Sequence, residues 1–214
     1  MKNVFQKVLE FEVDSYEDQT AEQIKTLISF QANIDHSESD CFACFFMGHG
    51  KDGKIIAKDN KSVDICTILD PIKKCHHLKG KPKLLFIQAC RVEIKSHAFV
   101  SDNLAMDNDT LKLKPLTNIV NKDENDMFIY YSTSACQLSY EIEGEFFFKT
   151  LCTVFKKQSN TDSLSLMINE INRNLFKTQG QQPEATSYLQ KEIFFTPKKN
   201  NVNYFTFLTF DKFI

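Results

Sequence analysis

Short apolar runs separated by amphipathic stretches recur along most of this chain. CFACFFM at 41–47, LLFIQ at 84–88 and MFIYYST at 127–133 are the clearest runs. Runs of this length and composition are typical of strands that are covered on both faces. A shorter alternating segment at 8–13 predicts a further strand, and the acidic residues at 14–18 predict a turn after it.

Helical spacing fills several of the intervals between these strands. Thr20 to Gln23 reads TAEQ, the form of a capping box in which the threonine and glutamine side chains bind two free backbone N–H groups. Ile24, Leu27 and Ile28 follow three and four residues apart, as on one face of a helix. Further helices are predicted at about 64–77, 145–157 and 162–177.

The order of these elements indicates one fold class. KIIAKDNKSVDI at 54–65 predicts a small hairpin that turns at 59–60, and KEIFF at 191–195 and VNYFTFLTF at 202–210 predict two late strands. Strands that alternate with helices favour an α/β fold, with a mostly parallel, twisted sheet and helices on both faces. Residues 92–126 lack periodicity and contain several acids, which predicts a long exposed loop. The length of 214 residues suits a single domain.

Composition narrows the class of partner. A net charge of -2 with 25% charged residues gives no reason to expect nucleic acid or an anionic membrane, so a protein or peptide partner is expected. No apolar run approaches the roughly 18 residues that cross a bilayer. The first residues, MKNVFQKVLEFEVD, carry acids where a signal peptide is apolar. A cytoplasmic location is therefore expected.

The cysteines do not predict a disulfide framework or a metal centre. There are seven of them, an odd number without the dense spacing of a small secreted scaffold, so reduced thiols are expected. CFAC at 41–44 and Cys75-His76-His77 imitate zinc ligands. Residues three apart along a strand point to opposite faces, so Cys41 and Cys44 do not converge on one ion. We expect neither a metal nor a cofactor.

Two residues at strand ends predict thiol chemistry. His49 follows one apolar run and Cys90 follows another, and in an open parallel sheet reactive groups lie where the strands end. An imidazole beside a thiol favours the reactive thiolate. The backbone amides of Gly50 and Cys90 are candidates for binding an oxyanion. From this pattern alone, a buried structural thiol remains an open alternative for Cys90.

Longer motifs resemble the caspase family. QACR at 88–91 after an apolar strand has the form of the caspase nucleophile signature. GHGKDGKI resembles the histidine loop of that family, YYSTSACQLSYE its substrate-binding loop and KEIFFTP its last strand. The resemblance implies His49 as general base and Cys90 as nucleophile. It also implies that Gln88 lines the primary specificity pocket and that Ser139 and Tyr140 line the peptide groove.

The chain departs from this family where aspartate is recognised. Caspases grip the substrate aspartate with two arginines, and one of them follows the serine and aromatic residue of the substrate loop, where this chain has Glu141. The other lies after the first core strand of the family, and the chain begins too late to include that strand. Only Arg91 and Arg173 are arginines among 26 basic residues. Three interpretations of the change at Glu141 remain open. A lysine from elsewhere fills the pocket, Glu141 turns outward, or the pocket prefers a basic substrate residue.

The missing first strand raises a question about the sheet. In the family that strand is central, so its loss leaves backbone groups without partners. Residues 202–210 are expected to fill the gap, from this chain or from a partner chain; the alternatives are an added edge strand or a dimer arm. We divide the chain into a caspase-like domain at 1–200 and a β-prone extension at 201–214. The domain comprises a large-subunit part at about 1–100, a linker at 92–126 and a small-subunit part at 127–197.

The resemblance also predicts processing and dimerisation. Asp123-Glu124-Asn125-Asp126 resembles the acidic tetrapeptide that executioner caspases prefer, so Asp126, with Asp107 and Asp109, is a candidate cleavage site in the linker. Dimerisation through the last strand is expected to involve Lys191, Glu192, Ile193, Phe194 and Phe195.

Two functions from different classes are consistent with these residues. One is a catalytically impaired caspase homologue that acts in apoptosis as a regulator or decoy, binding caspases or forming a homodimer. The other is an active cysteine endopeptidase that uses Cys90 and His49 with altered specificity. The sequence favours the regulator, because Glu141 would repel an aspartate side chain.

Overall fold

A computed structural model describes residues 1–51, 53–89, 126–133, 141–195 and 203–209. Fifteen regular elements occur in these ranges, with a short 3-10 helix at His76–Leu78 among them. The helices are α1 (Lys2–Lys7), α2 (Ala21–Asn33), α3 (Ile65–Lys74), α4 (Glu141–Gln158) and α5 (Leu164–Gln179). The strands are β1 (Phe11–Glu17), β2 (Phe42–Met47), β3 (Gly50–Lys51), β4 (Lys54–Ile56), β5 (Ser62–Asp64), β6 (Lys83–Gln88), β7 (Met127–Tyr131), β8 (Glu184–Ser187) and β9 (Asn203–Thr209).

Six strands form one twisted sheet in the order β1-β9-β2-β6-β7-β8. Every neighbouring pair is parallel except β7 and β8, which are antiparallel. The three short strands β3, β4 and β5 form a separate antiparallel sheet beside it. This arrangement confirms the predicted α/β fold, and the hairpin predicted at 54–65 is present as β4 and β5.

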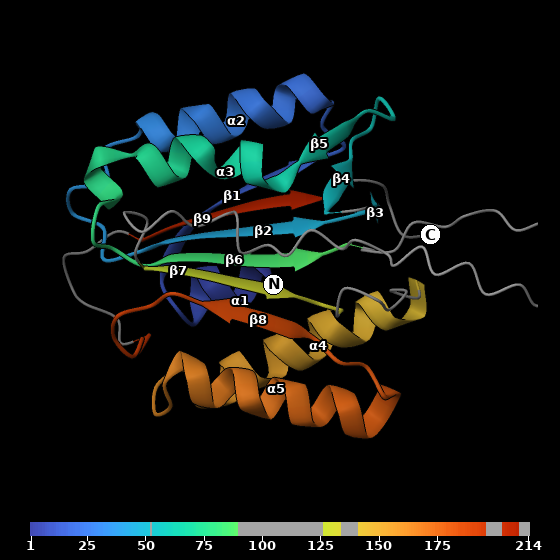
Figure 1. Cartoon of the computed structure of the whole chain (residues 1–214). Coiled ribbons are helices and arrows are strands. Elements are labelled where there is room, and N and C mark those ends of the chain that lie inside the picture. Colours follow the sequence, from blue (N-terminus) through green and yellow to red (C-terminus); the bar gives the residue numbers. More distant parts are fainter. Residues whose placement is uncertain (52, 90–125, 134–140, 196–202, 210–214) are drawn as a thin grey trace, which may run out of the picture.

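Helices cover both faces of the large sheet, with α2 and α3 on one face and α4 and α5 on the other (Figure 1). The alternation along β2 shows why two cores form. Phe42, Cys44 and Phe46 lie in the core under α2 and α3. Ala43 and Phe45 lie in the opposite core, with the apolar residues of α1, α4 and α5. A strand buried on both faces has no polar side, which explains the continuous apolar runs of the sequence.

Local signals define the helix ends. The capping box at Thr20 is present in full: the threonine hydroxyl accepts the Gln23 N–H at 3.3 Å, and the Gln23 side chain accepts the Thr20 N–H at 2.8 Å. Helix α5 begins after Ser163, whose side chain accepts the N–H of Leu166, and it ends at Gly180 with a φ of 65°. Glycine adopts that left-handed conformation without a steric penalty.

Two predictions about strands were wrong. Strand β1 extends to Glu17, so 14–18 is not an acidic turn, and helix α1 precedes it instead of a strand starting at 8. β1 lies at the edge of the described sheet, where acids on the solvent side are compatible with a strand and disfavour association with other edges.

The late strand was also misplaced. Residues Lys191, Glu192, Ile193, Phe194 and Phe195 do not form a strand; β8 at Glu184–Ser187 is the antiparallel edge strand instead. Ile193 leaves the sheet and its carbonyl accepts the Leu164 N–H at 2.8 Å. The ring of Phe195 packs against Phe11 and Phe155 in the core. Within KEIFF, Phe195 is thus buried in the core without strand pairing, whereas Phe194 is exposed.

Strand β9 lies inside the sheet. It pairs in parallel with β1 over 11–17 on one side and with β2 over 42–47 on the other. Thr206 and Leu208 are fully buried there. The expectation that this segment fills a gap between strands is confirmed, and within the described residues the filling strand comes from the chain itself.

Candidate active site

The carboxyl ends of β2 and β6 lie side by side. Met47 pairs with Gln88, and the Gly48 N–H donates to the Gln88 carbonyl at 3.0 Å. His49 follows this contact by one residue, and Cys90 is two residues beyond Gln88. The register of two parallel strands thus delivers the histidine segment and the strand that leads to Cys90 to the same edge of the sheet. Cys90 itself lies outside the described residues.

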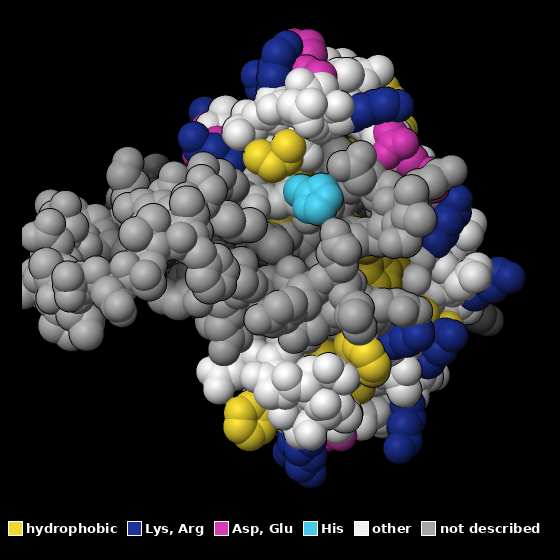
Figure 2. Space-filling model, turned by 90° about the vertical axis from the view of Figure 1, so that its right-hand side faces the viewer, with side chains coloured by type: hydrophobic (Ala, Val, Ile, Leu, Met, Phe, Trp, Pro, Cys, Tyr) yellow, Lys and Arg dark blue, Asp and Glu magenta, His cyan; other side chains and the backbone are white. Residues whose placement is uncertain are grey.

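His49 is held by its backbone and exposes its ring. Its carbonyl accepts the N–H of Ile56 at 2.9 Å, and Gly50 pairs with Ile55 in the small sheet. The side chain of His49 is exposed while Gly48 before it is buried. Figure 2 looks onto this carboxyl edge of the sheet, where a histidine side chain is visible at the surface. The side chain of His49 is therefore reached by solvent at this edge.

Uncharged polar side chains lie beneath this edge. Gln88 is 2% exposed and Ser132 is fully buried, and neither the Gln88 Oε1 nor the Ser132 Oγ has a hydrogen-bond partner among the described residues. The Ser132 N–H donates to the Ile87 carbonyl at 2.9 Å, so Ser132 continues β7 next to Gln88. By alternation both side chains face α4 and α5, the side that holds Phe86 and Tyr130.

Gln181 also belongs to this group of buried polar side chains. Its Nε2 donates to the Ser132 carbonyl at 2.8 Å, and its Oε1 is buried and has no partner within the described part of the chain. Sequence reasoning identified Gln88 but missed Ser132 and Gln181. The run MFIYYST did contain the signal for Ser132, a hydroxyl directly after a buried strand at the same edge. Gln181 had no such signal, because its position depends on where α5 ends.

Lys83 is a buried cation, and it lies at the opposite end of β6 from Gln88. Its Nζ donates to the carbonyls of Leu78 at 3.1 Å and Lys81 at 2.8 Å. Lys83 therefore lies away from the polar group of Gln88, Ser132 and Gln181. Glu141 is the first residue of α4, and its side chain lies outside the description. Ser139, Tyr140, Asp107 and Asp109 also lie outside the described residues.

Asp126 is fixed in the structure at the start of β7. Its N–H donates to the Tyr188 carbonyl at 3.1 Å and its carbonyl accepts the Lys83 N–H at 2.8 Å. The side-chain Oδ1 accepts the Gln190 N–H at 3.2 Å, and the φ angle is 72°. The next residue, Met127, is fully buried. The peptide bond after Asp126 is thus part of the sheet and not of an exposed loop.

The described cysteines are unsuited to metal binding. Cys41 and Cys44 lie in different cores, which confirms that residues three apart on this strand face opposite ways. Burial raises the pKa of the Cys41 thiol to about 12 and also raises the pKa of Cys44. Within the described ranges, no three histidine, cysteine or acidic side chains converge in a way that could hold a metal ion. None of the described helices is long and apolar enough to cross a membrane.

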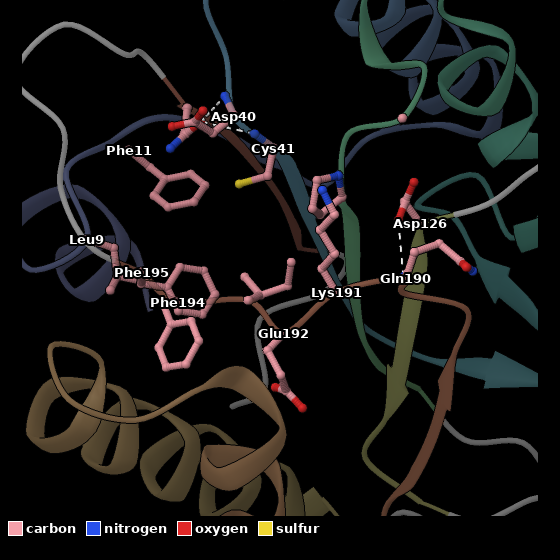
Figure 3. A pocket seen from close by; sticks show the side chains of 14 residues that line it. Leu9, Phe11, Asp40, Cys41, Asp126, Gln190, Lys191, Glu192, Phe194 and Phe195 are labelled. Atoms are coloured by element: carbon pink, nitrogen blue, oxygen red, sulfur yellow. Dashed lines mark hydrogen bonds between the residues drawn. The ribbon is translucent and has the colours of Figure 1, made fainter.

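A pocket of about 750 Å³ opens at the other end of the strands (Figure 3). Phe11, Phe195 and Ile193 line its apolar wall, and Asp40 and Asn203 lie at its rim. The pocket includes neither His49 nor Gln88, so it is separate from the candidate active site.

Comparisons with known proteins agree with this arrangement. Residues 1–194 match the family described as the caspase domain. The chain is 31% identical to caspase-7 of Gallus gallus over 202 residues, covering 87% of this chain and 65% of the relative. It is 30% identical to caspase-8 of Mus musculus over 208 residues, covering 89% of this chain and 42% of that relative. Caspase-3 of Mesocricetus auratus is 28% identical over 203 residues. The chain thus spans less than two thirds of the first two relatives.

Proposed function

Because this chain belongs to the caspase family, we propose that it is a caspase-type cysteine endopeptidase with His49 as general base and Cys90 as nucleophile. The observation that carries the proposal is the 3.0 Å hydrogen bond from the Gly48 N–H to the Gln88 carbonyl. This bond joins the end of β2, one residue before His49, to the end of β6, two residues before Cys90. Groups that must share a proton need this proximity before their pKa values matter.

The chemistry follows from these two groups. His49 accepts the proton of the Cys90 thiol, and the thiolate attacks the carbonyl carbon of the scissile peptide bond. The oxyanion that forms is bound by the backbone N–H groups of Gly50 and Cys90. The imidazolium gives its proton to the leaving amine, and the thioester that remains is hydrolysed by water. The products are a carboxylic acid and an amine, with the enzyme restored.

Selectivity is proposed to lie away from aspartate. Glu141 stands where the family has a guanidinium, and the buried residues that we propose beneath the pocket, Gln88, Ser132 and Gln181, are uncharged. Loss of a buried hydrogen-bonded charge pair costs about 2–5 kcal/mol. That is roughly 30- to 4,000-fold in discrimination.

A peptide library tests the proposal. Purified protein is incubated with fluorogenic tetrapeptides that vary the residue before the scissile bond, beside Cys90→Ala and the matched thiol control Cys75→Ala. We expect cleavage by the wild type and by Cys75→Ala, none by Cys90→Ala, and weak turnover after aspartate. No cleavage of any peptide by folded wild-type protein would remove the proposal.

The second candidate is a catalytically impaired regulator of apoptosis that binds caspases in the cytoplasm. The replacement of the family arginine by Glu141 favours it, because substrate binding is then weakened while the fold persists. The proposed contact surface is the edge strand β8 with the adjoining residues 191–195. Size-exclusion chromatography with active caspases tests it: a stable complex together with an inert library result supports the regulator. Independent elution of the two proteins counts against it.

A further inference from the structure

Strand β9 is the direct neighbour of the strand that leads to His49. Thr209, its last residue, pairs with Met47 of β2 on one side and with Glu17 of β1 on the other. The carbonyl of Thr209 accepts the Asp18 N–H at 2.9 Å. β9 therefore supports β2 along its whole length and ends two residues before the histidine. β2 is thus held by β9 on one side and by β6 on the other, so the position of His49 depends on both pairings.

One side chain holds β9 in that register at the opposite end of the sheet. The Oδ1 of Asn203 accepts the backbone N–H groups of Asp40 at 2.8 Å and Cys41 at 3.1 Å. Asp40 and Cys41 lie directly before β2, and dashed lines in Figure 3 mark these hydrogen bonds. An asparagine at the first position of β9 thus joins β9 to the start of β2 through two hydrogen bonds at once.

The backbone pairing along β9 does not by itself exclude a shift of its register relative to β2. A slip by one residue would turn Thr206 and Leu208, now fully buried, to the other face of the sheet. A slip by two keeps the faces but displaces every backbone pair by about 7 Å. The contacts of Asn203 with two successive N–H groups exist in a single register, because only that register places its Oδ1 between them.

We propose that Asn203 is a positioning residue for the active site, which sets the register of β9 against β2 and thereby the place of His49. The inference rests on the proposed function for its kinetic consequence, but its structural consequence is independent of catalysis. The distance from Asn203 to the end of β9 is six residues, about 20 Å along the strand. A displacement of about 1 Å at a reacting group can reduce the rate about 100-fold.

The experiment compares the full chain with Asn203→Ala, which removes the acceptor, and Asn203→Asp, which keeps it. Asn33→Ala is the matched control, because Asn33 makes a single exposed hydrogen bond at the end of α2. Hydrogen exchange is followed at the amides of Gly48 and of β9. In parallel, kcat and KM are measured with the best library peptide.

We expect Asn203→Ala to speed exchange at Gly48 at least tenfold and to lower kcat about 10- to 100-fold, with KM changed less than about twofold. Asn203→Asp keeps an acceptor oxygen but places a second carboxylate next to Asp40. We therefore expect it to restore only part of the exchange protection at Gly48 and part of kcat. Faster exchange in β9 with Gly48 and kcat unchanged would overturn the proposal. If Asn203→Ala does not fold, Asn203→Asp decides alone: exchange at Gly48 less than tenfold faster than in Asn33→Ala supports the acceptor role, whereas exchange at least tenfold faster overturns it. If the wild type cleaves nothing, the proposed function fails and the exchange at Gly48 still decides this inference.

Discussion

The hydroxyl of Thr206 offers a direct measure of how β9 is seated. Thr206 is fully buried in the middle of the sheet, paired with Asp14 of β1 and Cys44 of β2, and its Oγ1 has no hydrogen-bond partner among the residues that the structure describes. A buried hydroxyl without a partner costs about 1–3 kcal/mol. Thr206→Val keeps the shape and replaces that hydroxyl with a methyl group.

The expected change is a gain in stability. Removing the unsatisfied group and burying a methyl, worth about 0.8 kcal/mol, together predict that the free energy of unfolding rises by about 2–4 kcal/mol. For a protein of this size that corresponds to a thermal midpoint roughly 4–16 °C higher. Urea unfolding followed by circular dichroism measures the change in the free energy of unfolding. An unchanged m-value is the check on two-state behaviour.

Thr209→Val is the matched control on the same strand, because Thr209 is only half-buried. We expect it to change stability by less than about 0.5 kcal/mol. Equal effects of the two substitutions would refute the reasoning, since Thr206 would then not differ from a strand-end residue. A loss of stability in Thr206→Val would show that the hydroxyl is hydrogen-bonded after all.

Three further predictions follow from the local geometry. An executioner caspase should cut folded protein after Asp126 far more slowly than urea-treated protein, because that bond is held in the sheet; equal rates by mass spectrometry would contradict this. Thr20→Ala should lower the free energy of unfolding by about 1 kcal/mol through loss of the capping box, measured by urea titration against Thr67→Ala at an exposed site. The pKa of Cys41 is raised from 9.0 to about 12, so the thiol ionises in the unfolded chain first. Stability should fall as pH rises from 9 towards 12, and Cys41→Ala should reduce that slope in a pH series of unfolding curves.

Sequence reasoning succeeded where a signal was local. The buried strands, the capping box at Thr20 and the hairpin at 54–65 each depend on neighbouring residues, and all are present. It failed at KEIFF, because apolar residues in a strand and apolar residues in a segment that seals a core have the same composition. The acids at 14–17 led to the prediction of a turn where β1 continues. An edge strand tolerates polar side chains that a central strand does not.

The sequence by itself determined the fold class and identified the candidate catalytic residues. Alternating strands and helices require a mostly parallel sheet, and GHG and QACR mark two of its ends. Only the tertiary structure decided that β9 lies between β1 and β2, that Asn203 joins it to the start of β2, and that Ser132 and Gln181 meet beside Gln88. Pairing between segments far apart in the chain depends on which backbone groups remain without partners once the rest of the sheet has formed, and no local pattern of residues records that.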